Sequence, residues 1–474
     1  MDAPRFRIAA IDLFERDVTL RLPFRFGAAT LCACPQAFVR AHIELADGRA
    51  AVGASAELMV PKWFDKNPAL SPAQNVDDLR ASLRAAAEAY RSDPAARTAF
   101  GHFAAHHDAL REHGRRARHE ALVDHYGPAL VDRALLDALC RALGVPFATL
   151  MQHNGAGIEA DPLAPDLAGF DLDTFLRTLA PAPSIAARHT VGLLDAVRDA
   201  DAPADAPRDG LPVSLEGAIR RHRLTHFKLK LCGDVARDLA RLGAIAAQTD
   251  EVAERITLDG NEQYPDAAAF AAFLDALAST PALDRLVART AFVEQPIRRD
   301  RSFDTDLSAL APRVPLLIDE ADGSLDAFVQ ARRLGYRGVS SKSCKGLYKA
   351  VLNTARAAQW NATAAPADRC FVSGEDLTMQ AGLAVQQDLA LVALLGLPDV
   401  ERNGHHYVDG MAALPAAEQS AFLAAHPDLY RREAGADGPV VRLVIERGRI
   451  ALASLLAAPS FASSAWPDWA TMRP

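Results

Sequence analysis

The feature that most constrains the fold is a series of short β-prone runs that each end in an ionisable residue. Their last residues are Lys230, Asp259, Glu294, Asp319, Lys342 and Glu375. Successive ends lie 23 to 35 residues apart, and helix-like stretches separate them. A (β/α)8 barrel uses about 250 residues, or roughly 31 per unit. The spacing therefore predicts an α/β protein built on a TIM-type barrel, with residues 189–193 and 399–402 as its first and last strands.

The remaining sequence predicts a second domain and a tail. Residues 1–150 begin with alternating apolar and polar side chains typical of antiparallel strands and continue as an Ala-rich helical stretch, which predicts an α+β capping domain. We expect the barrel over residues 185–435 and a strand-rich tail, 436–474, that returns to the capping domain and completes it. Residues 195–212 are rich in Pro, Asp and Ala and predict a long loop on the catalytic face.

Composition narrows the class of protein. The 474 residues are 50% hydrophobic and carry a net charge of −8, which argues against a nucleic-acid partner. No apolar run reaches the ~20 residues of a membrane span. The six cysteines are scattered and no apolar leader opens the chain, so we expect a cytoplasmic protein. A capped barrel is also compatible with a homo-oligomer.

Three successive strand ends predict a metal site. The C-terminal ends of barrel strands meet at one mouth, so Asp259, Glu294 and Asp319 should converge there. Three like charges in one place are costly unless a cation neutralises them. Carboxylate oxygens suit a hard divalent ion, so the expected metal is Mg²⁺, with Mn²⁺ as a substitute.

Three lysines predict acid/base chemistry beside that metal. Lys228 and Lys230 are two residues apart on one strand and should point to the same side, into the barrel. Lys342 should arrive from the opposite side. Burial near a cation and another ammonium group is expected to depress a lysine pKa toward neutrality and make the lysine a usable base. One lysine on each face of a substrate could remove a proton on one side and return it on the other.

Together these motifs resemble the enolase superfamily, specifically the muconate lactonizing enzyme subgroup that also contains the dipeptide epimerases. The resemblance rests on Lys228-Leu-Lys230, Leu258-Asp259-Gly-Asn261, Val293-Glu294-Gln-Pro296, Ile318-Asp319-Glu320 and Ser341-Lys342-Ser-Cys-Lys345-Gly346. It implies that the three acids hold Mg²⁺, that Lys230 and Lys342 are the opposed bases, and that Lys228 touches the substrate carboxylate. The seventh strand carries no His, unlike the His-Asp dyad of the mandelate racemase pattern.

The reaction implied by this resemblance is removal of the proton α to a carboxylate, which gives a metal-stabilised enediolate. Lysines on both faces favour racemisation or epimerisation of a small carboxylic acid, such as an amino-acid or dipeptide derivative. Cycloisomerisation or dehydration by the same chemistry stays open, as does a non-catalytic metal-binding barrel. A Schiff-base aldolase could also use Lys230 or Lys342, but it leaves the three clustered acids unexplained.

Further residues are candidates for substrate contacts. Residues 22–27 include Phe24, Arg25 and Phe26 and predict either a lid over the barrel or a packed strand end. Around the barrel mouth, the candidates for substrate contacts or structural hydrogen bonds are Asn261, Glu320, Glu375 and Asp376.

Overall fold

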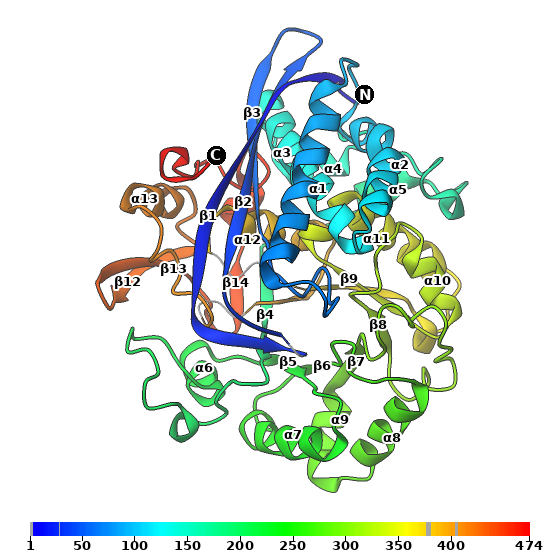
Figure 1. The fold of residues 1–474 in the computed structure, drawn as a ribbon, viewed down its shortest axis with the longest axis vertical. Coiled ribbons are helices and arrows are strands. Elements are labelled where there is room, and N and C mark those ends of the chain that lie inside the picture. Colours follow the sequence, from blue (N-terminus) through cyan, green and yellow to red (C-terminus); the bar gives the residue numbers. More distant parts are fainter. Residues whose placement is uncertain (1–2, 28, 376–380, 403–405) are drawn as a thin grey trace.

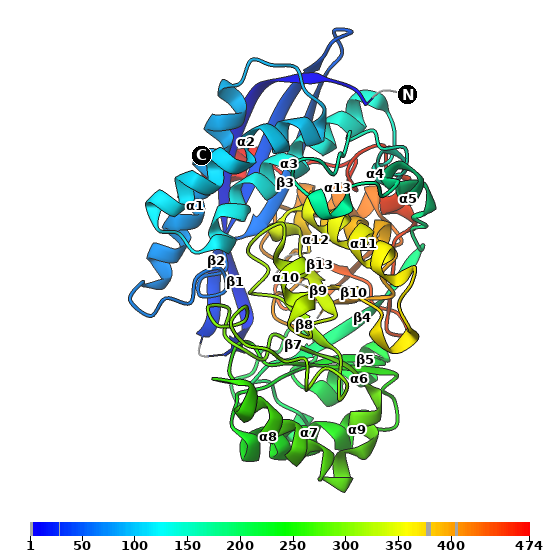
Figure 2. The same cartoon turned by 90° about the vertical axis from the view of Figure 1, so that its right-hand side faces the viewer.

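The structure is a computed structural model that describes residues 3–27, 29–375, 381–402 and 406–474. An antiparallel sheet with long helices lies at one end of the molecule, and a closed parallel barrel lies at the other (Figures 1 and 2). The expected α/β barrel with a capping domain is therefore confirmed. Among the described residues, none of the helices is both long and apolar enough to cross a bilayer.

The capping domain is built on a three-stranded antiparallel sheet in the order β1-β2-β3. Its strands are β1 (Phe6–Phe26), β2 (Ala29–Leu45) and β3 (Ala50–Leu58), and its helices are α1 (Pro72–Ser92), α2 (Ala99–Ala117) and α3 (Ala121–Leu143). The buried helix α3 packs closely on β3 at Gly53. A Cβ atom at Gly53 would lie 2.2 Å from the Ala134 carbonyl oxygen and the Ala138 nitrogen, so only glycine allows this contact.

Eight parallel strands form the barrel, and β11 pairs with β4 to close it. They are β4 (Ser184–Val191), β5 (His226–Lys230), β6 (Arg255–Asp259), β7 (Thr290–Glu294), β8 (Leu316–Ile318), β9 (Gly338–Ser341), β10 (Phe371–Gly374) and β11 (Asp399–Glu401). The six strand ends expected from the sequence agree to within one residue, because each apolar run is followed by an ionisable residue at the barrel mouth.

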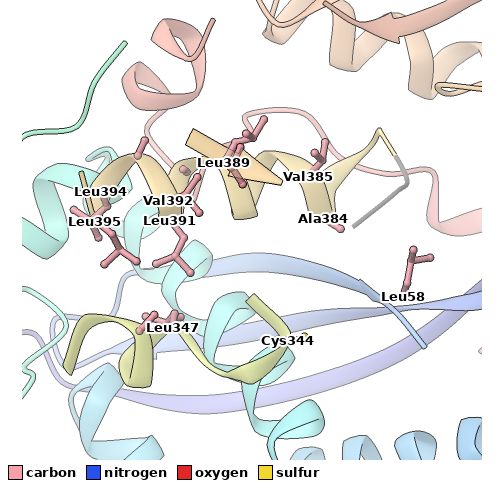
Figure 3. Packing of buried hydrophobic residues seen from close by; sticks show 14 of the residues in the cluster. Leu58, Cys344, Leu347, Ala384, Val385, Leu389, Leu391, Val392, Leu394 and Leu395 are labelled. Carbon is pink, nitrogen blue, oxygen red and sulfur yellow. The ribbon is translucent and has the colours of Figure 1, made fainter. Parts of the chain in front are cut away.

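Helices surround the barrel between most of these strands. They are α6 (Leu215–His222), α7 (Val235–Thr249), α8 (Ala267–Ala278), α9 (Asp284–Arg289), α10 (Ala327–Arg333), α11 (Leu347–Asn361) and α12 (Leu383–Leu394). Every residue of helix α12 is buried, including the hydrogen-bonded Gln386, Gln387 and Asp388, so this helix has no solvent face. Figure 3 shows Leu391 and Leu395 on the side of α12 toward Leu347, and Val385 and Leu389 on its other side.

Short elements link the two domains and form the tail: α4 (Phe147–Gln152), α5 (Leu172–Thr178), α13 (Ala416–Ala425), β12 (Tyr430–Gly435), β13 (Gly438–Leu443), β14 (Arg449–Ala451) and α14 (Ala453–Ala457). Strands β12, β13 and β14 of the tail do not join the N-terminal sheet. Strands β12 and β13 pair with each other, and β14 adds antiparallel to the first residues of barrel strand β4.

The last residues of the tail do reach the capping domain. The Phe461 amide donates to Asp137 of α3 at 2.8 Å, and Glu15 and Arg473 exchange backbone hydrogen bonds of 2.8 and 3.0 Å. The Phe461 ring stacks on Phe147 with 3.7 Å between centroids. The chain end therefore fastens the cap to the barrel, and its Arg473 forms an isolated antiparallel bridge with Glu15 of β1.

Candidate active site at the barrel mouth

The strand ends bring one ammonium group and four carboxylates together at the centre of the barrel. Lys228 Nζ lies 3.0 Å from Asp259 Oδ2, and 2.7 Å from an oxygen of each of Glu294 and Glu375. It also lies 2.9 Å from Glu401 Oε2. All five side chains are buried. A buried charge requires compensation, so these residues form one electrostatic unit.

Glu401 is a site residue that the sequence analysis missed. It is the last residue of β11, and the Thr190 hydroxyl donates to its carboxylate. Burial raises the pKa of Glu401, but Lys228, Lys230 and Lys342 together hold it well below its usual range. The signal was present in the sequence, because an acid at the C-terminal end of a barrel strand is the same pattern that identified Asp259 and Glu294.

Lys230 and Lys342 stand on opposite sides of the barrel. Their strands, β5 and β9, are four positions apart in the ring of eight. Lys230 Nζ lies 2.6 Å from Asp259 Oδ2, and Lys342 Nζ lies 2.7 Å from Asp319 Oδ2. The two ammonium groups therefore approach the shared acidic centre from opposed directions.

Glu294 has the least satisfied carboxylate in the site. It is fully buried, and among the described residues no group donates a hydrogen bond to either of its oxygens. The Lys228 ammonium is near Oε2 but is not oriented as a hydrogen-bond donor to it. Burial, together with the nearby carboxylates of Asp259 and Glu375, raises the pKa of Glu294 well above its usual range. A cation at this position would remove that penalty.

The donor chemistry fits a hard divalent cation, although the side chains are not drawn together around one point. Asp259, Glu294 and Asp319 offer buried carboxylate oxygens, which are the ligands that Mg²⁺ prefers. Among the described residues, however, no three Asp, Glu, His or Cys side chains converge at metal-binding geometry. The lysines hold these carboxylates instead, so an ion bound here must compete with Lys228 and Lys342 for the same oxygens.

Two of the lysines have pKa values that differ from the sequence-based expectation. Burial lowers the pKa of Lys228, but Asp259 and Glu294 outweigh burial and raise it well above its usual range. Burial also lowers the pKa of Lys342, and the Asp319 carboxylate reverses that effect and raises it. The expected depression toward neutrality is therefore wrong for this arrangement, because each ammonium lies in direct contact with carboxylates.

The capping domain places an aromatic ring near each of the opposed lysines. The centroid of the Phe24 ring lies 5.8 Å from Lys230 Nζ, and the centroid of the Trp63 ring lies 4.5 Å from Lys342 Nζ. Both rings are buried. Phe24 belongs to the end of β1, which pairs with Leu31 of β2, so residues 22–26 form a packed strand end rather than a free lid loop. Trp63, in the connection between β3 and α1, was not identified from the sequence.

Two basic residues, Arg299 and Lys66, attach the segment between β3 and α1, the Trp63 connection, to the barrel. Arg299, in the β7–β8 connection, donates hydrogen bonds of 2.8 Å to the carbonyl oxygens of Trp63 and Phe64. From the capping side, Lys66 Nζ lies 3.1 Å from the Asn261 carbonyl oxygen and 3.3 Å from Glu320 Oε1. These contacts hold the cap directly over the strand ends (Figure 2).

The other candidate substrate contacts have different surroundings. The Asn261 amide donates to Glu320 Oε1 at 3.0 Å, and both side chains are buried. Phe26 packs on Phe24 with 5.5 Å between ring centroids, whereas Arg25 is exposed. Asp376 lies outside the described residues.

Glu375 is an ion-pair partner inside the barrel. Besides Lys228, it binds the fully buried Arg188 of β4. Arg188 also binds Asp399 of β11 and donates to the Gly374 carbonyl oxygen at 2.8 Å. Arg188 thus joins the first strand to the last two and compensates the excess acid charge in the barrel.

Comparison with known proteins supports the assignment of the fold. Residues 212–418 match the family model described as enolase C-terminal domain-like. Over these residues the barrel is similar to the C-terminal domains of the enolase superfamily. The sequence-based assignment to that superfamily of enzymes is therefore confirmed. No curated protein matches the sequence significantly.

Solved structures of the superfamily share the fold over nearly the whole chain. A mandelate racemase/muconate lactonizing protein from Herpetosiphon aurantiacus has 16% identity, a TM-score of 0.56 and coverage of 96% of this chain and 98% of its own. Muconate lactonizing enzyme from Pseudomonas fluorescens, complexed with muconolactone, has 18% identity, a TM-score of 0.55 and 97% coverage of both chains. N-succinyl Arg/Lys racemase from Bacillus cereus has 18% identity, a TM-score of 0.52 and coverage of 84% and 87%. At these identities the likeness concerns the fold.

Proposed function

We propose that this enolase-superfamily chain removes and returns the proton α to the carboxylate of a small organic acid, as a racemase or epimerase. The observation that carries the proposal is the placement of Lys230 and Lys342 on opposite strands, with the carboxylates of Asp259 and Asp319 beside them. Inversion at a carbon centre needs one proton-transfer group on each face of that carbon.

We propose Asp259, Glu294 and Asp319 as the ligands of a divalent cation, with Mg²⁺ expected and Mn²⁺ as a substitute. The unsatisfied oxygens of Glu294 support this assignment. When bound, such a cation supplies positive charge to the substrate carboxylate and so makes the neighbouring C–H group more acidic.

The lysines would then act as the two bases. In the present arrangement Asp319 favours the charged form of Lys342. A cation held by Asp319 would offset the negative charge that raises the pKa of Lys342, while burial would still lower it. On the other face, Lys230 Nζ contacts Asp259 Oδ2 at 2.6 Å. One of the two, in its neutral form, accepts the α proton, and the other donates a proton to the opposite face.

Phe24 and Trp63 would close the site above the substrate. Their buried rings lie against the two ammonium groups and leave little room for water there. Excluding water protects the carbanionic form of the substrate from protonation by solvent and strengthens every charge interaction in the site. Lys228, with Glu401 and Glu375 as partners, remains available at the centre to bind the substrate carboxylate.

The proposal is tested by solvent exchange. Pools of dipeptides, N-acyl amino acids, sugar acids and lactones are incubated with the protein and Mg²⁺ in D2O, and mass spectrometry detects any gain of one deuterium. We expect such a gain in one class of acid and its loss in Asp259→Asn. Exchange that persists in that variant contradicts the metal assignment, and absence of exchange in every pool contradicts the proton-transfer chemistry for these acids.

The same assay separates racemisation from the alternatives. Racemisation gives deuterium in both stereoisomers, whereas a cycloisomerase or dehydratase gives a product of different connectivity or a loss of water. Muconate lactonizing enzyme and 2-chloromuconate cycloisomerase are among the proteins of similar fold, so muconate-type acids and their lactones belong in the pools.

A further inference from the structure

A buried polar chain contacts Asp319 Oδ1, whereas Lys342 contacts the other carboxylate oxygen, Oδ2. The Lys345 side chain, in the short turn Ser343–Lys345 after β9, is only 2% exposed. Its Nζ donates to Ser340 Oγ at 2.7 Å and lies 2.8 Å from Asp322 Oδ2. It is also 3.3 Å from the Asp319 carbonyl oxygen and 3.5 Å from Asp319 Oδ1. The proton-transfer steps proposed above make no use of this lysine.

The contacts of Lys345 fix the direction of a hydroxyl hydrogen. A serine hydroxyl has one hydrogen and two acceptor lone pairs. Because the Lys345 ammonium has only donors, it must occupy a lone pair of Ser340 Oγ. The single hydrogen of Ser340 then points to Asp319 Oδ1, with which Oγ forms a short hydrogen bond. Asp319 Oδ2 meanwhile faces Lys342 at 2.7 Å.

We propose that Ser340 and Lys345 are positioning residues that fix the rotation of the Asp319 carboxylate for metal binding. The inference rests on the proposed function, in which Asp319 is a metal ligand. Residues that hydrogen-bond to a ligating carboxylate typically change metal affinity about 10- to 100-fold when they are removed. Ser340 acts directly on Asp319. Lys345 contacts Asp319 itself at 3.3 and 3.5 Å, and its shorter bond to Ser340, at 2.7 Å, is the route by which it positions the carboxylate.

The chain offers a matched control at the next residue. Ser341 is as buried as Ser340, at 2% against 3% exposure, but among the described residues its hydroxyl has no hydrogen-bond partner. Alternation along β9 turns Ser341 away from the face that carries Ser340. Ser340→Ala and Ser341→Ala therefore delete the same atom from the same strand, and only one of them touches Asp319.

The first test measures Mn²⁺ binding to the purified full-length variants by electron paramagnetic resonance, with thermal unfolding as a check on folding. We expect Ser340→Ala to raise the Mn²⁺ dissociation constant by about tenfold or more, and Ser341→Ala to leave it unchanged. Equal dissociation constants in the two variants overturn the role of Ser340.

The second test asks whether Lys345 acts through Ser340. Lys345→Met also removes a positive charge, which by itself should tighten Mn²⁺ binding, so the substitution is made both with Ser340 present and in Ser340→Ala. The direct charge effect is common to both backgrounds and cancels in this cycle. We expect Lys345→Met to shift the dissociation constant unfavourably by at least about twofold more when Ser340 is present. Identical shifts in both backgrounds overturn the relay.

Failure of the inference and failure of the proposed function look different in these experiments. If the unsubstituted protein does not bind Mn²⁺, or Asp319→Asn binds it equally well, the metal site itself is overturned and the positioning role falls with it. If the unsubstituted protein binds Mn²⁺ and Asp319→Asn does not, the metal site stands, and the two tests above decide the roles of Ser340 and Lys345.

Discussion

Arg299 should hold the Trp63 connection of the cap in place over the barrel. Its guanidinium donates to both oxygens of Glu262 at 3.0 Å and to the carbonyl oxygens of Trp63 and Phe64 at 2.8 Å. Its side chain is 8% exposed. Arg299→Met leaves two carbonyl groups without this donor and leaves Lys66 beside the buried Glu262 carboxylate. Breaking a buried ion pair typically costs about 3–5 kcal/mol, and because Lys66 stays we expect the lower end, about 3 kcal/mol.

The neighbouring arginine supplies the control. Arg298 forms an ion pair with Asp300, and the two side chains are 63% and 56% exposed. Losing such an exposed pair in Arg298→Met should lower the free energy of unfolding by at most about 1 kcal/mol. If the loss of about 3 kcal/mol in Arg299→Met destabilises only residues 59–71, the equilibrium constant for local unfolding of this segment rises roughly a hundredfold.

Hydrogen–deuterium exchange measured by mass spectrometry reads this effect directly. We expect peptides from residues 59–71 to exchange much faster in Arg299→Met than in Arg298→Met, while peptides from the barrel strands stay the same. Turnover should also fall, because the ring beside Lys342 belongs to this connection. Equal exchange in the two variants refutes the reasoning that Arg299 anchors the cap.

Three further predictions concern the fold, the centre of the site and the metal. Gly53→Ala should destabilise the protein by about 1–3 kcal/mol because its Cβ would meet the α3 backbone at 2.2 Å. In contrast, Gly243→Ala should stabilise the protein by about 0.5–1 kcal/mol, because a Cβ atom at this position on α7 meets open space. Thermal unfolding measures the sign of both changes. Stabilisation by Gly53→Ala contradicts the packing account. Glu401→Gln should lower kcat at least about tenfold because it removes one charge from the partners of Lys228, and an unchanged kcat removes Glu401 from the site. Removal of metal with EDTA should abolish turnover, and added Mg²⁺ or Mn²⁺ should restore it. Glu294→Gln should need a higher metal concentration for the same restoration. Undiminished turnover in EDTA contradicts the proposed metal centre.

The sequence predicts the barrel well because its signal is local. Each strand is a short apolar run, and the ionisable residue after it marks the mouth, as with Asp259 at the end of β6 and Glu294 at the end of β7. Parallel pairing then brings such residues together, whatever lies between them in the chain. Glu401 follows the same rule and could have been found by applying it to the last strand.

Other features depend on contacts between distant segments and carry no local signal. Trp63 lies beside Lys342 only because Arg299 and Lys66 fasten the cap to the barrel loops. The raised lysine pKa values depend on how many carboxylates surround each ammonium, which spacing alone does not give. Strand β14 could not be assigned to β4 because an apolar strand can pair with any open edge of compatible register.

The most direct test of the central claim compares the two opposed lysines on a substrate found by the exchange screen. Lys230→Met and Lys342→Met are each incubated in D2O with separate stereoisomers, and deuterium at the α carbon is followed by NMR. The account predicts that both variants lose racemisation and that each still exchanges one stereoisomer, with opposite preferences. Loss of exchange with both stereoisomers in one variant, and full activity in the other, would show a single base and contradict the account.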